Sequence, residues 1–337
     1  MGDDTNERDD DTPHAGQPHD ALIRELLSRP DDAASALRAV LPADLTAHLD
    51  LDALQLEPGT FIDDVLTHRQ VDLLFTTTCL GEDAYLYILI EHQRTVDHLM
   101  AYRMLAYQAR IWADYLKQLG PDEPAPRQLP LIIPIVLYQG RRRWNAPADF
   151  GDLLAAEPAT RAVLGELIPR VRYHLADLTT VDAETLRAWP LTTTVRLTFI
   201  ALQRGPGDKD VTRWLVDWTG DIRALLSAGK RHEVAVLFTY LEIVSNTRTE
   251  RLREYAATIS PEAEEIAMTT GQQLIAQGRA EGRAEGRAET IIDAVELRLG
   301  SLDEHTRARI QSGTPTQLDR WLANLISGAT TLDEVFA

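Results

Sequence analysis

The chain has 337 residues, of which 44% are hydrophobic and 26% charged, and these values exclude wholesale disorder. A single cysteine, Cys79, excludes intramolecular disulfides and cysteine-rich zinc sites. The formal net charge of −18 argues at first against nucleic acid as a partner, but the charge is uneven. Residues 1–20 hold seven acids and one base, whereas residues 60–150 hold eleven acids and nine bases. The whole-chain charge is therefore weak evidence about any one site.

No run of about 18 apolar residues occurs, so we expect no membrane-spanning helix and no membrane partner. The polar, acidic first 20 residues lack the basic start and apolar stretch of a signal peptide. A cytoplasmic protein is the expectation.

The first half of the chain alternates helical and extended patterns. An acidic disordered tail is predicted over 1–18, followed by a helix that begins at Asp20 and ends at Pro30 and a second helix over 32–41. A short strand or extended segment over 54–62 comes next, then strands over 71–78 and 84–90. A helix over 96–118, capped by Thr95, is followed by strands over 129–138 and 171–175. The turn signal Gly81-Glu82-Asp83 joins two of these strands into a hairpin. The apolar run at 129–138 follows a crossover helix, which favours a buried strand joined in parallel. The resulting order is α-β-β-β-α-β.

The second half is predicted to be helical from Ala183 to Leu274, with turns at residues 204–207. A tetrapeptide, Gly-Arg-Ala-Glu, then repeats three times over residues 278–289. The last 48 residues are expected to form a separate helical module. Its predicted apolar positions are Leu297, Leu299, Leu302, Ile310, Leu318, Leu322 and Ile326.

The hairpin can bring acidic residues together. If Gly81 and Glu82 form its two-residue loop, Asp72 lies directly opposite Glu91, and Gln93 lies on the same face. Two adjacent carboxylates repel each other unless a cation lies between them, and Mg²⁺ suits carboxylate and carbonyl ligands. The alternative is that the acids are incidental. A one-residue slip would separate them, and a helix cap or an ion pair with Arg69 or Arg94 would explain each one singly.

Several motifs resemble the recombination-promoting nuclease, or putative transposase, family of the PD-(D/E)XK phosphodiesterase superfamily. The resemblance covers residues 19 to about 290, with an appended C-terminal helical domain of unknown function. The matching segments are His19-Asp20 with Glu25-Leu26-Leu27, Phe61-Ile62-Asp63, Val71-Asp72-Leu73-Leu74-Phe75, Ile88-Leu89-Ile90-Glu91-His92-Gln93, Met100-Ala101-Tyr102-Arg103 with Tyr107, residues 129–140 ending in Tyr138-Gln139-Gly140, and the glycine-spaced repeat.

This resemblance implies a restriction-endonuclease-like α/β core with a mixed sheet, and a metal-dependent DNA endonuclease activity. Asp72 and Glu91 would hold Mg²⁺, with Mn²⁺ or Ca²⁺ as alternative ions, and the backbone carbonyl of His92 would be a further ligand. Gln93 stands where many relatives have lysine, as in the Glu-x-Gln form that the resemblance implies for this family. A glutamine can orient water or phosphate but supplies no positive charge.

Other candidate residues have two readings each. Glu25 or Asp20 could bring a further acid to the metal or could cap a helix, and Asp63 could approach the metal or stabilise a turn. Five arginines could contact DNA phosphates or could simply form solvated faces. They are Arg103, Arg110, Arg141, Arg142 and Arg143.

Two functions follow from these patterns. The first is a Mg²⁺-dependent DNA endonuclease, and the second is a catalytically degenerate nuclease-fold protein that acts as an oligomerising interaction module. In the repeat, Gly and Ala stripes permit close backbone approach, so residues 278–289 could assemble with a second copy or serve as a flexible linker. The predicted division is a tail (1–18), a nuclease-like domain (19–180), a helical extension (181–275), a repeat helix or linker (276–290) and a C-terminal module (291–337).

Overall fold

A computed structural model of the chain describes residues 17–57, 71–91, 96–119, 126–140 and 143–337. The chain divides into two compact units, one that ends at Ala267 and one over Met268–Ala337. Each unit is described by itself. The finer division into five segments stays a prediction.

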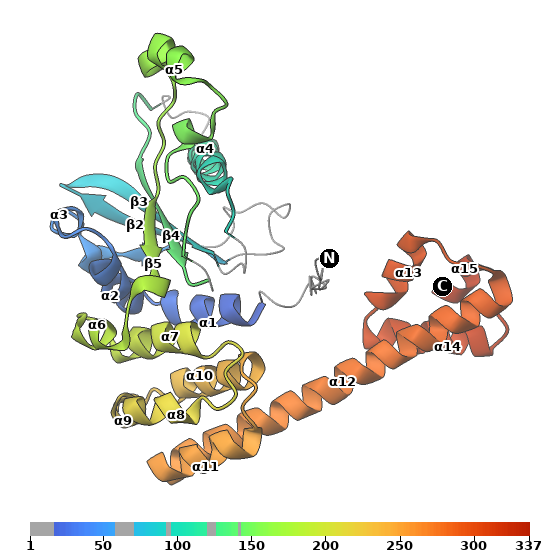
Figure 1. The fold of residues 1–337 in the computed structure, drawn as a ribbon. Helices are drawn as coiled ribbons and strands as arrows, with labels where there is room; N and C mark the ends of the chain where they lie inside the picture. The colour runs from blue at the N-terminus through green and yellow to red at the C-terminus, as the bar shows by residue number, and fades with distance from the viewer. Residues whose placement is uncertain (1–16, 58–70, 92–95, 120–125, 141–142) are drawn as a thin grey trace, which may run out of the picture. The chain divides into compact units, whose positions relative to one another are not determined.

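The first unit contains a mixed five-stranded sheet whose strands lie in chain order (Figure 1). The strands are β1 (Gln55–Leu56), β2 (Val71–Cys79), β3 (Glu82–Glu91), β4 (Leu131–Tyr138) and β5 (His174–Asp177). The β1–β2 and β2–β3 pairs are antiparallel, and the β3–β4 and β4–β5 pairs are parallel. The predicted hairpin and the predicted parallel strand are thereby confirmed. β5 lies three residues later than the predicted strand at 171–175.

The register of the β2–β3 hairpin differs from the prediction. Cys79 pairs with Glu82, so the two loop residues are Leu80 and Gly81, and Asp72 lies opposite Leu89 instead of Glu91. Both loop residues have positive φ, 53° and 86°, as a two-residue turn that matches strand twist requires. A turn at Leu80 is not expected from the sequence, because leucine rarely adopts a positive φ.

Helices cover both faces of the sheet. On one face, α1 (Gln17–Leu27), α2 (Pro30–Val40) and α7 (Thr193–Arg204) share a core with Leu73 and Phe75 of β2. On the other face, α4 (Met100–Gln118) packs its buried side chains against Leu74, Tyr87 and Val136. Each large apolar side chain buried in this way contributes about 1.5–3 kcal/mol. The buried face of α4 consists of Met100, Ala101, Met104, Tyr107, Gln108 and Ile111.

Helix α4 begins later than predicted. Its first residue is Met100, and Leu99, which precedes it, is 58% exposed. The carboxylate of Asp97 accepts a hydrogen bond from the Leu99 backbone N–H at 2.8 Å and forms an ion pair with Arg103 at 2.8 Å. Asp97 therefore binds the N-cap residue and the first turn of α4, whereas the predicted cap, Thr95, lies outside the described residues.

The chain after the sheet is helical, as predicted for residues 183–274, and its last helix continues through the repeat to Leu299. Besides α7, these helices are α6 (Ala183–Ala188), α8 (Thr212–Leu215), α9 (Thr219–Ser227), α10 (Arg231–Val244), α11 (Thr249–Ile259) and α12 (Pro261–Leu299). Two more helices lie earlier in the chain, α3 (Ala43–Thr46) before the sheet and α5 (Pro158–Leu164) between β4 and β5. Short 3₁₀ turns are η1 (Leu51–Ala53), η4 (Phe150–Leu153), η5 (Gly165–Leu167), η6 (Leu178–Thr180) and η7 (Val216–Trp218).

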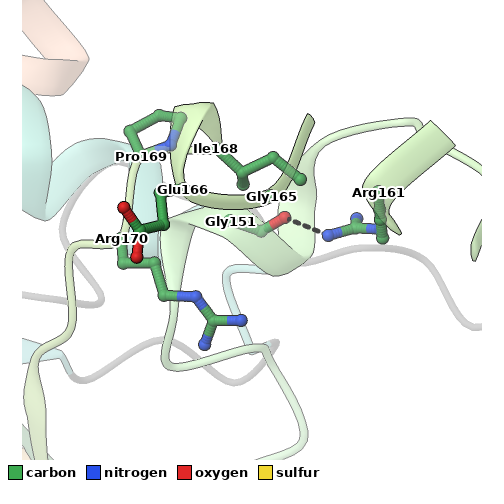
Figure 2. A pocket seen from close by; sticks show the side chains of 7 residues that line it. All are labelled: Gly151, Arg161, Gly165, Glu166, Ile168, Pro169 and Arg170. Atoms are coloured by element: carbon green, nitrogen blue, oxygen red, sulfur yellow. Dashed lines mark hydrogen bonds between the residues drawn. The ribbon is translucent and has the colours of Figure 1, made fainter. Parts of the chain in front are cut away.

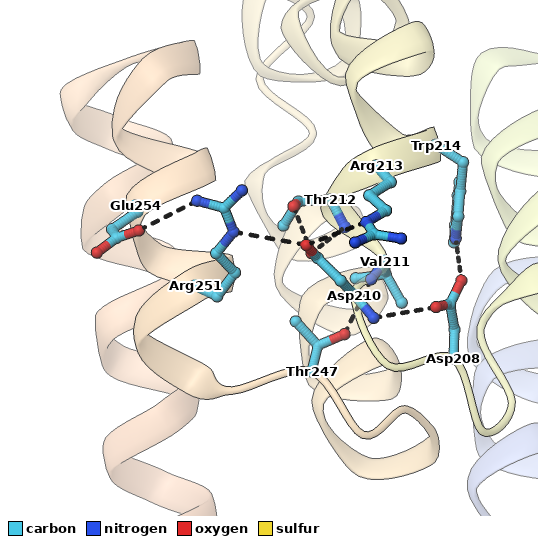
Figure 3. Close-up of polar contacts among 9 residues, drawn as sticks. All are labelled: Asp208, Asp210, Val211, Thr212, Arg213, Trp214, Thr247, Arg251 and Glu254. Atoms are coloured by element: carbon cyan, nitrogen blue, oxygen red, sulfur yellow. Dashed lines mark hydrogen bonds and ion pairs between the residues drawn. The ribbon is translucent and has the colours of Figure 1, made fainter.

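A polar corner fixes the turn between α7 and α8 (Figure 3). Asp208 accepts hydrogen bonds from Trp214 Nε1 at 3.1 Å and from the Asp210 backbone N–H at 3.0 Å. Asp210 accepts from the Thr212 hydroxyl and forms an ion pair with Arg251 of α11 at 3.6 Å. The hydrogen bonds from Thr212 and the nearby arginines lower the pKa of Asp210, so its carboxylate stays charged near neutral pH.

The second unit has its own core, built from α12, α13 (Glu304–Gln311), α14 (Pro315–Ile326) and α15 (Leu332–Phe336). The prediction is confirmed for Ile310 and Leu318, which are buried, but Leu297 and Ile326 are 88% and 76% exposed. Leu297 lies two residues beyond the buried Val295, on another side of the helix. No helix in the described part of the chain has the length and apolar character needed to cross a membrane.

Glu242 of α10 provides a test of this packing. Both of its carboxylate oxygens are enclosed and have no hydrogen-bond partner among the described residues, and burial raises its pKa to about 7. A raised carboxyl pKa means that folding favours the protonated form. The contribution of protonated Glu242 to the stability of the fold is fully present below the usual pKa of 4.5 and is lost as the pH rises towards 7.

We therefore expect Glu242→Gln to match the wild type in urea unfolding at pH 4.5 and to be about 1 kcal/mol more stable at pH 8. Glu254→Gln, at a side chain that is 70% exposed, is the control and should behave like the wild type at both values. If Glu242→Gln and the wild type differ in unfolding free energy by the same amount at both pH values, the raised pKa of Glu242 is contradicted.

Candidate active site

The candidate acidic positions lie at the carboxyl end of the sheet, which consists of the ends of β3, β4 and β5 together with the start of β2. The last residues of the three parallel strands are in register, with Glu91 paired to Tyr138 and Tyr138 paired to Asp177. Asp72 is the second residue of β2, at the same end.

Asp72 and Glu91 occupy positions on one face of this end. Asp72 pairs with Leu89, and Glu91 follows Leu89 by two residues, so strand alternation puts positions 72 and 91 on the same face. The observed register differs from the predicted one by two residues, and a shift by an even number of residues leaves each side chain on the same face of the sheet. The two acids are therefore diagonal neighbours instead of directly opposed ones. Only their backbone belongs to the described structure.

Several predicted residues lie outside the described ones. They are Asp63, His92, Gln93, Arg141 and Arg142. The side chain of Asp20 is also outside. Glu25 is described, and its carboxylate accepts from His232 Nε2 of α10 at 2.7 Å, so it is occupied in a contact between α1 and α10.

Of the predicted DNA-contacting arginines, Arg103 is held inside the protein. Its guanidinium binds Asp97 and donates to the Tyr107 hydroxyl at 3.1 Å, and its side chain is 23% exposed. Arg110 lies two turns further along α4 and is exposed, as is Arg143. Arg110 and Arg143 are thus accessible to a phosphate, whereas Arg103 orders the start of α4.

An aromatic wall stands beside the end of β4, formed by Tyr138, Trp144 and Tyr173. The Tyr138 and Trp144 rings meet edge to face at 4.8 Å, and Trp144 Nε1 donates to the Tyr173 hydroxyl at 3.0 Å. Burial raises the pKa of Tyr173 to about 12, so its phenol is neutral and does not act as a base. The ring of Tyr138 also passes so close to Gly140 that a Cβ there would lie 2.0 Å from the hydroxyl oxygen.

Two cavities lie in the connections around β4 and β5. The larger, about 570 Å³, lies in the segment between β4 and β5 and is lined by Gly151, Arg161, Gly165, Glu166, Ile168, Pro169 and Arg170 (Figure 2). The Arg161 guanidinium there donates to the carbonyls of Gly151, Leu154 and Ala156, which is a structural role. The smaller, about 230 Å³, includes Gln139 and Gly140 and so lies at the carboxyl end of the sheet.

The donor set suits a hard divalent cation. Among the side chains that the structure describes, no group of three or more His, Cys, Asp or Glu residues could hold a metal ion. The pair at positions 72 and 91 offers carboxylate oxygens on one face, and oxygen donors are what Mg²⁺ prefers.

Sequence reasoning missed the aromatic wall and the role of Asp97. The wall joins residues up to 35 positions apart, so no local pattern predicts it. The run Tyr138-Gln139-Gly140, directly after a buried strand, was the available signal for its position.

The mixed sheet with helices on both faces defines an α/β protein. The chain belongs to the family described as "Putative transposase, YhgA-like", whose sequence model matches residues 17–232. The predicted family is thereby confirmed. The PD-(D/E)XK assignment of the core stays a prediction, and no solved structure shows significant similarity.

Curated relatives carry nuclease names, and some are named inactive. Recombination-promoting nuclease RpnA of Escherichia coli K12 is 27% identical over 268 residues, 77% of this chain and 84% of the relative. RpnD of Escherichia coli O157:H7 is 36% identical over 125 residues, 37% of this chain and 46% of RpnD. The chain thus spans less than half of RpnD. The inactive recombination-promoting nuclease-like protein RpnE of Escherichia coli K12 is 28% identical over 270 residues, 77% of this chain and 82% of RpnE.

A glycine substitution tests the aromatic wall. In Gly140→Ala the new methyl group must displace the Tyr138 ring or the backbone, so we expect a loss of about 1–3 kcal/mol in thermal unfolding. Gly220→Ala is the matched control. Gly220 lies in α9, a Cβ there meets nothing within 4 Å, and alanine is the better helix former, so this variant should be neutral or slightly stabilised. Equal stability of the two variants would show that the Tyr138 ring is free to move.

Proposed function

We propose that the protein is a metal-dependent DNA endonuclease that hydrolyses phosphodiester bonds. The observation that carries this proposal is the placement of Asp72 and Glu91 on one face at the carboxyl end of the sheet. Family membership and the nuclease names of the relatives support it. Mg²⁺ is the proposed ion, with Mn²⁺ or Ca²⁺ as substitutes.

Each residue has a separate proposed task. Asp72, Glu91 and the His92 carbonyl would hold the ion, and Gln93 would orient a water molecule for attack on the phosphorus. The bound ion supplies Lewis acidity, which favours ionisation of water and stabilises the negative charge of the phosphoryl centre. The water oxygen would form a new P–O bond while the P–O bond to the leaving strand breaks; the water releases one proton to the solvent, and the leaving oxygen takes up one proton from the solvent. Because the glutamine amide does not titrate, Gln93 contributes orientation and no proton transfer.

DNA would be held largely through its phosphates. Arg110 of α4 and Arg143 after β4 are exposed, and Arg141 and Arg142 precede Arg143 in the chain. Arg103, which is bound to Asp97, would act by ordering the start of α4.

A second candidate function rests on two observations. Gln93 supplies no positive charge, and one relative, RpnE of Escherichia coli K12, is named inactive, while another, YjiP of the same strain, is named "putative inactive". The protein would then be an interaction module that assembles through residues 278–289, which lie within α12. Retention of both acids favours the nuclease.

Plasmid nicking tests the proposal. With Mg²⁺ or Mn²⁺ the wild type should nick supercoiled DNA, EDTA should abolish nicking, and Asp72→Asn and Glu91→Gln should each lower the rate about 100-fold or more, because each removes a metal-bound charge. Asp83→Asn is the matched control, since Asp83 is an exposed acid at the other end of the same hairpin, and it should keep full activity.

Two results would refute the assignment. Nicking that survives in both acid variants would point to another site or to a contaminant. If the wild type fails to nick with every ion while light scattering shows an oligomer, the interaction module becomes the better description.

A further inference from the structure

The 230 Å³ cavity at the carboxyl end of the sheet has no task in the proposed hydrolysis. Its lining comes from the residues that follow β4, from η6 and the start of α6, and from the end of α7. The polar side chains in the lining belong to Gln139, Thr179, Asp182, Gln203 and Arg204.

Hydrogen bonds within the protein hold the lining of this cavity in place. Gln203 Nε2 donates to the carbonyls of Leu178 and Val181 at 2.6 and 2.9 Å. Asp177, the last residue of β5, accepts from the Thr179 backbone N–H at 2.9 Å. The cavity is therefore shaped before any ligand arrives, which lowers the ordering cost of binding.

The charges in the lining favour a neutral ligand. Asp182 is the only acid and Arg204 the only base among the lining residues. Hydrogen bonds from Thr185 lower the pKa of Asp182, so it is ionised, and the described structure records no ion pair for either group. A phosphate would gain from Arg204 but would be repelled by Asp182. A neutral ring with both donors and acceptors would satisfy both groups.

We propose that this cavity binds a guanine base of the DNA strand that the enzyme cleaves. Guanine presents two adjacent donors, N1–H and N2–H₂, that suit a carboxylate, and two adjacent acceptors, O6 and N7, that suit a guanidinium. Asp182 is the N-cap residue of α6 and Arg204 is the last residue of α7, so the two charges in the lining come from different elements. Adenine, with one exocyclic amine and no paired donors, would leave Asp182 poorly matched.

The place of the cavity fits this ligand, and here the inference rests on the proposed nuclease function. Gln139 directly follows Tyr138, which is the β-sheet partner of Glu91, and neighbouring strands lie about 4.8 Å apart. The lining extends to Gln203 and Arg204 of α7, on the sheet face opposite α4. A base that enters is thus unstacked from a duplex or belongs to a single strand, as in enzymes that extrude a base.

Saturation-transfer NMR with the full chain tests binding without any cleavage. In EDTA, 2′-deoxyguanosine should bind, and deoxyadenosine, deoxycytidine and thymidine should bind at least tenfold more weakly. Arg204→Gln and Asp182→Asn should each weaken deoxyguanosine binding about tenfold, since each removes a specific contact. Asparagine also caps helices well, so the second variant should keep α6. Arg24→Gln, which alters an exposed arginine in the last turn of α1, is the control and should leave binding unchanged.

Mapping of the cleavage sites separates this inference from the nuclease proposal. If the protein nicks DNA, the wild type should prefer sites near guanine, and Arg204→Gln should lose that preference while still cleaving. Equal binding of all four nucleosides, no binding of deoxyguanosine, or binding unaffected in both variants would overturn the guanine site. Selective deoxyguanosine binding by a protein that nicks no DNA would support the cavity and refute only the nuclease.

Discussion

The turn at Leu80 and Gly81 sets the register of the β2–β3 hairpin, and the candidate site depends on that register. With this turn, Asp72 pairs with Leu89, and Glu91 lies two residues further along the same face. Lengthening or shortening the loop by one residue would move one acid to the opposite face and separate the pair. The crossover through α4 then brings β4 alongside β3 in parallel, so that Tyr138 lies beside Glu91.

Around this pair, the two sides of the sheet have different tasks. The α4 side holds the aromatic wall beside the end of β4 and the Asp97–Arg103 ion pair at the start of α4. The α7 side supplies a small polar cavity with one carboxylate and one guanidinium. Chemistry at the acids and recognition of a base would therefore take place on opposite faces of one end of the sheet.

Periodicity predicted much of the fold because the relevant signals are local. The buried Met100, Met104 and Ile111 recur at helical spacing, and the apolar run that ends at Tyr138 indicated a buried parallel strand. The turn was missed because Leu80 adopts a conformation that its side chain disfavours. Leu297 and Ile326 were misplaced because the core of the second unit is filled by Val295, Trp321 and Leu325 instead. The aromatic wall joins distant segments, which a single sequence does not reveal.

The central claim is that Asp72 and Glu91 act together on one ion. Electron paramagnetic resonance of Mn²⁺ measures this directly, through the loss of the free-ion signal when the ion binds the full chain. One ion should bind per chain, and Asp72→Asn, Glu91→Gln and the double variant should all lose it to the same extent, because a shared ligand set fails as a unit. Undiminished Mn²⁺ binding in both single variants would contradict a shared site. So would a loss of Mn²⁺ binding free energy in the double variant that equals the sum of the losses in the two single variants.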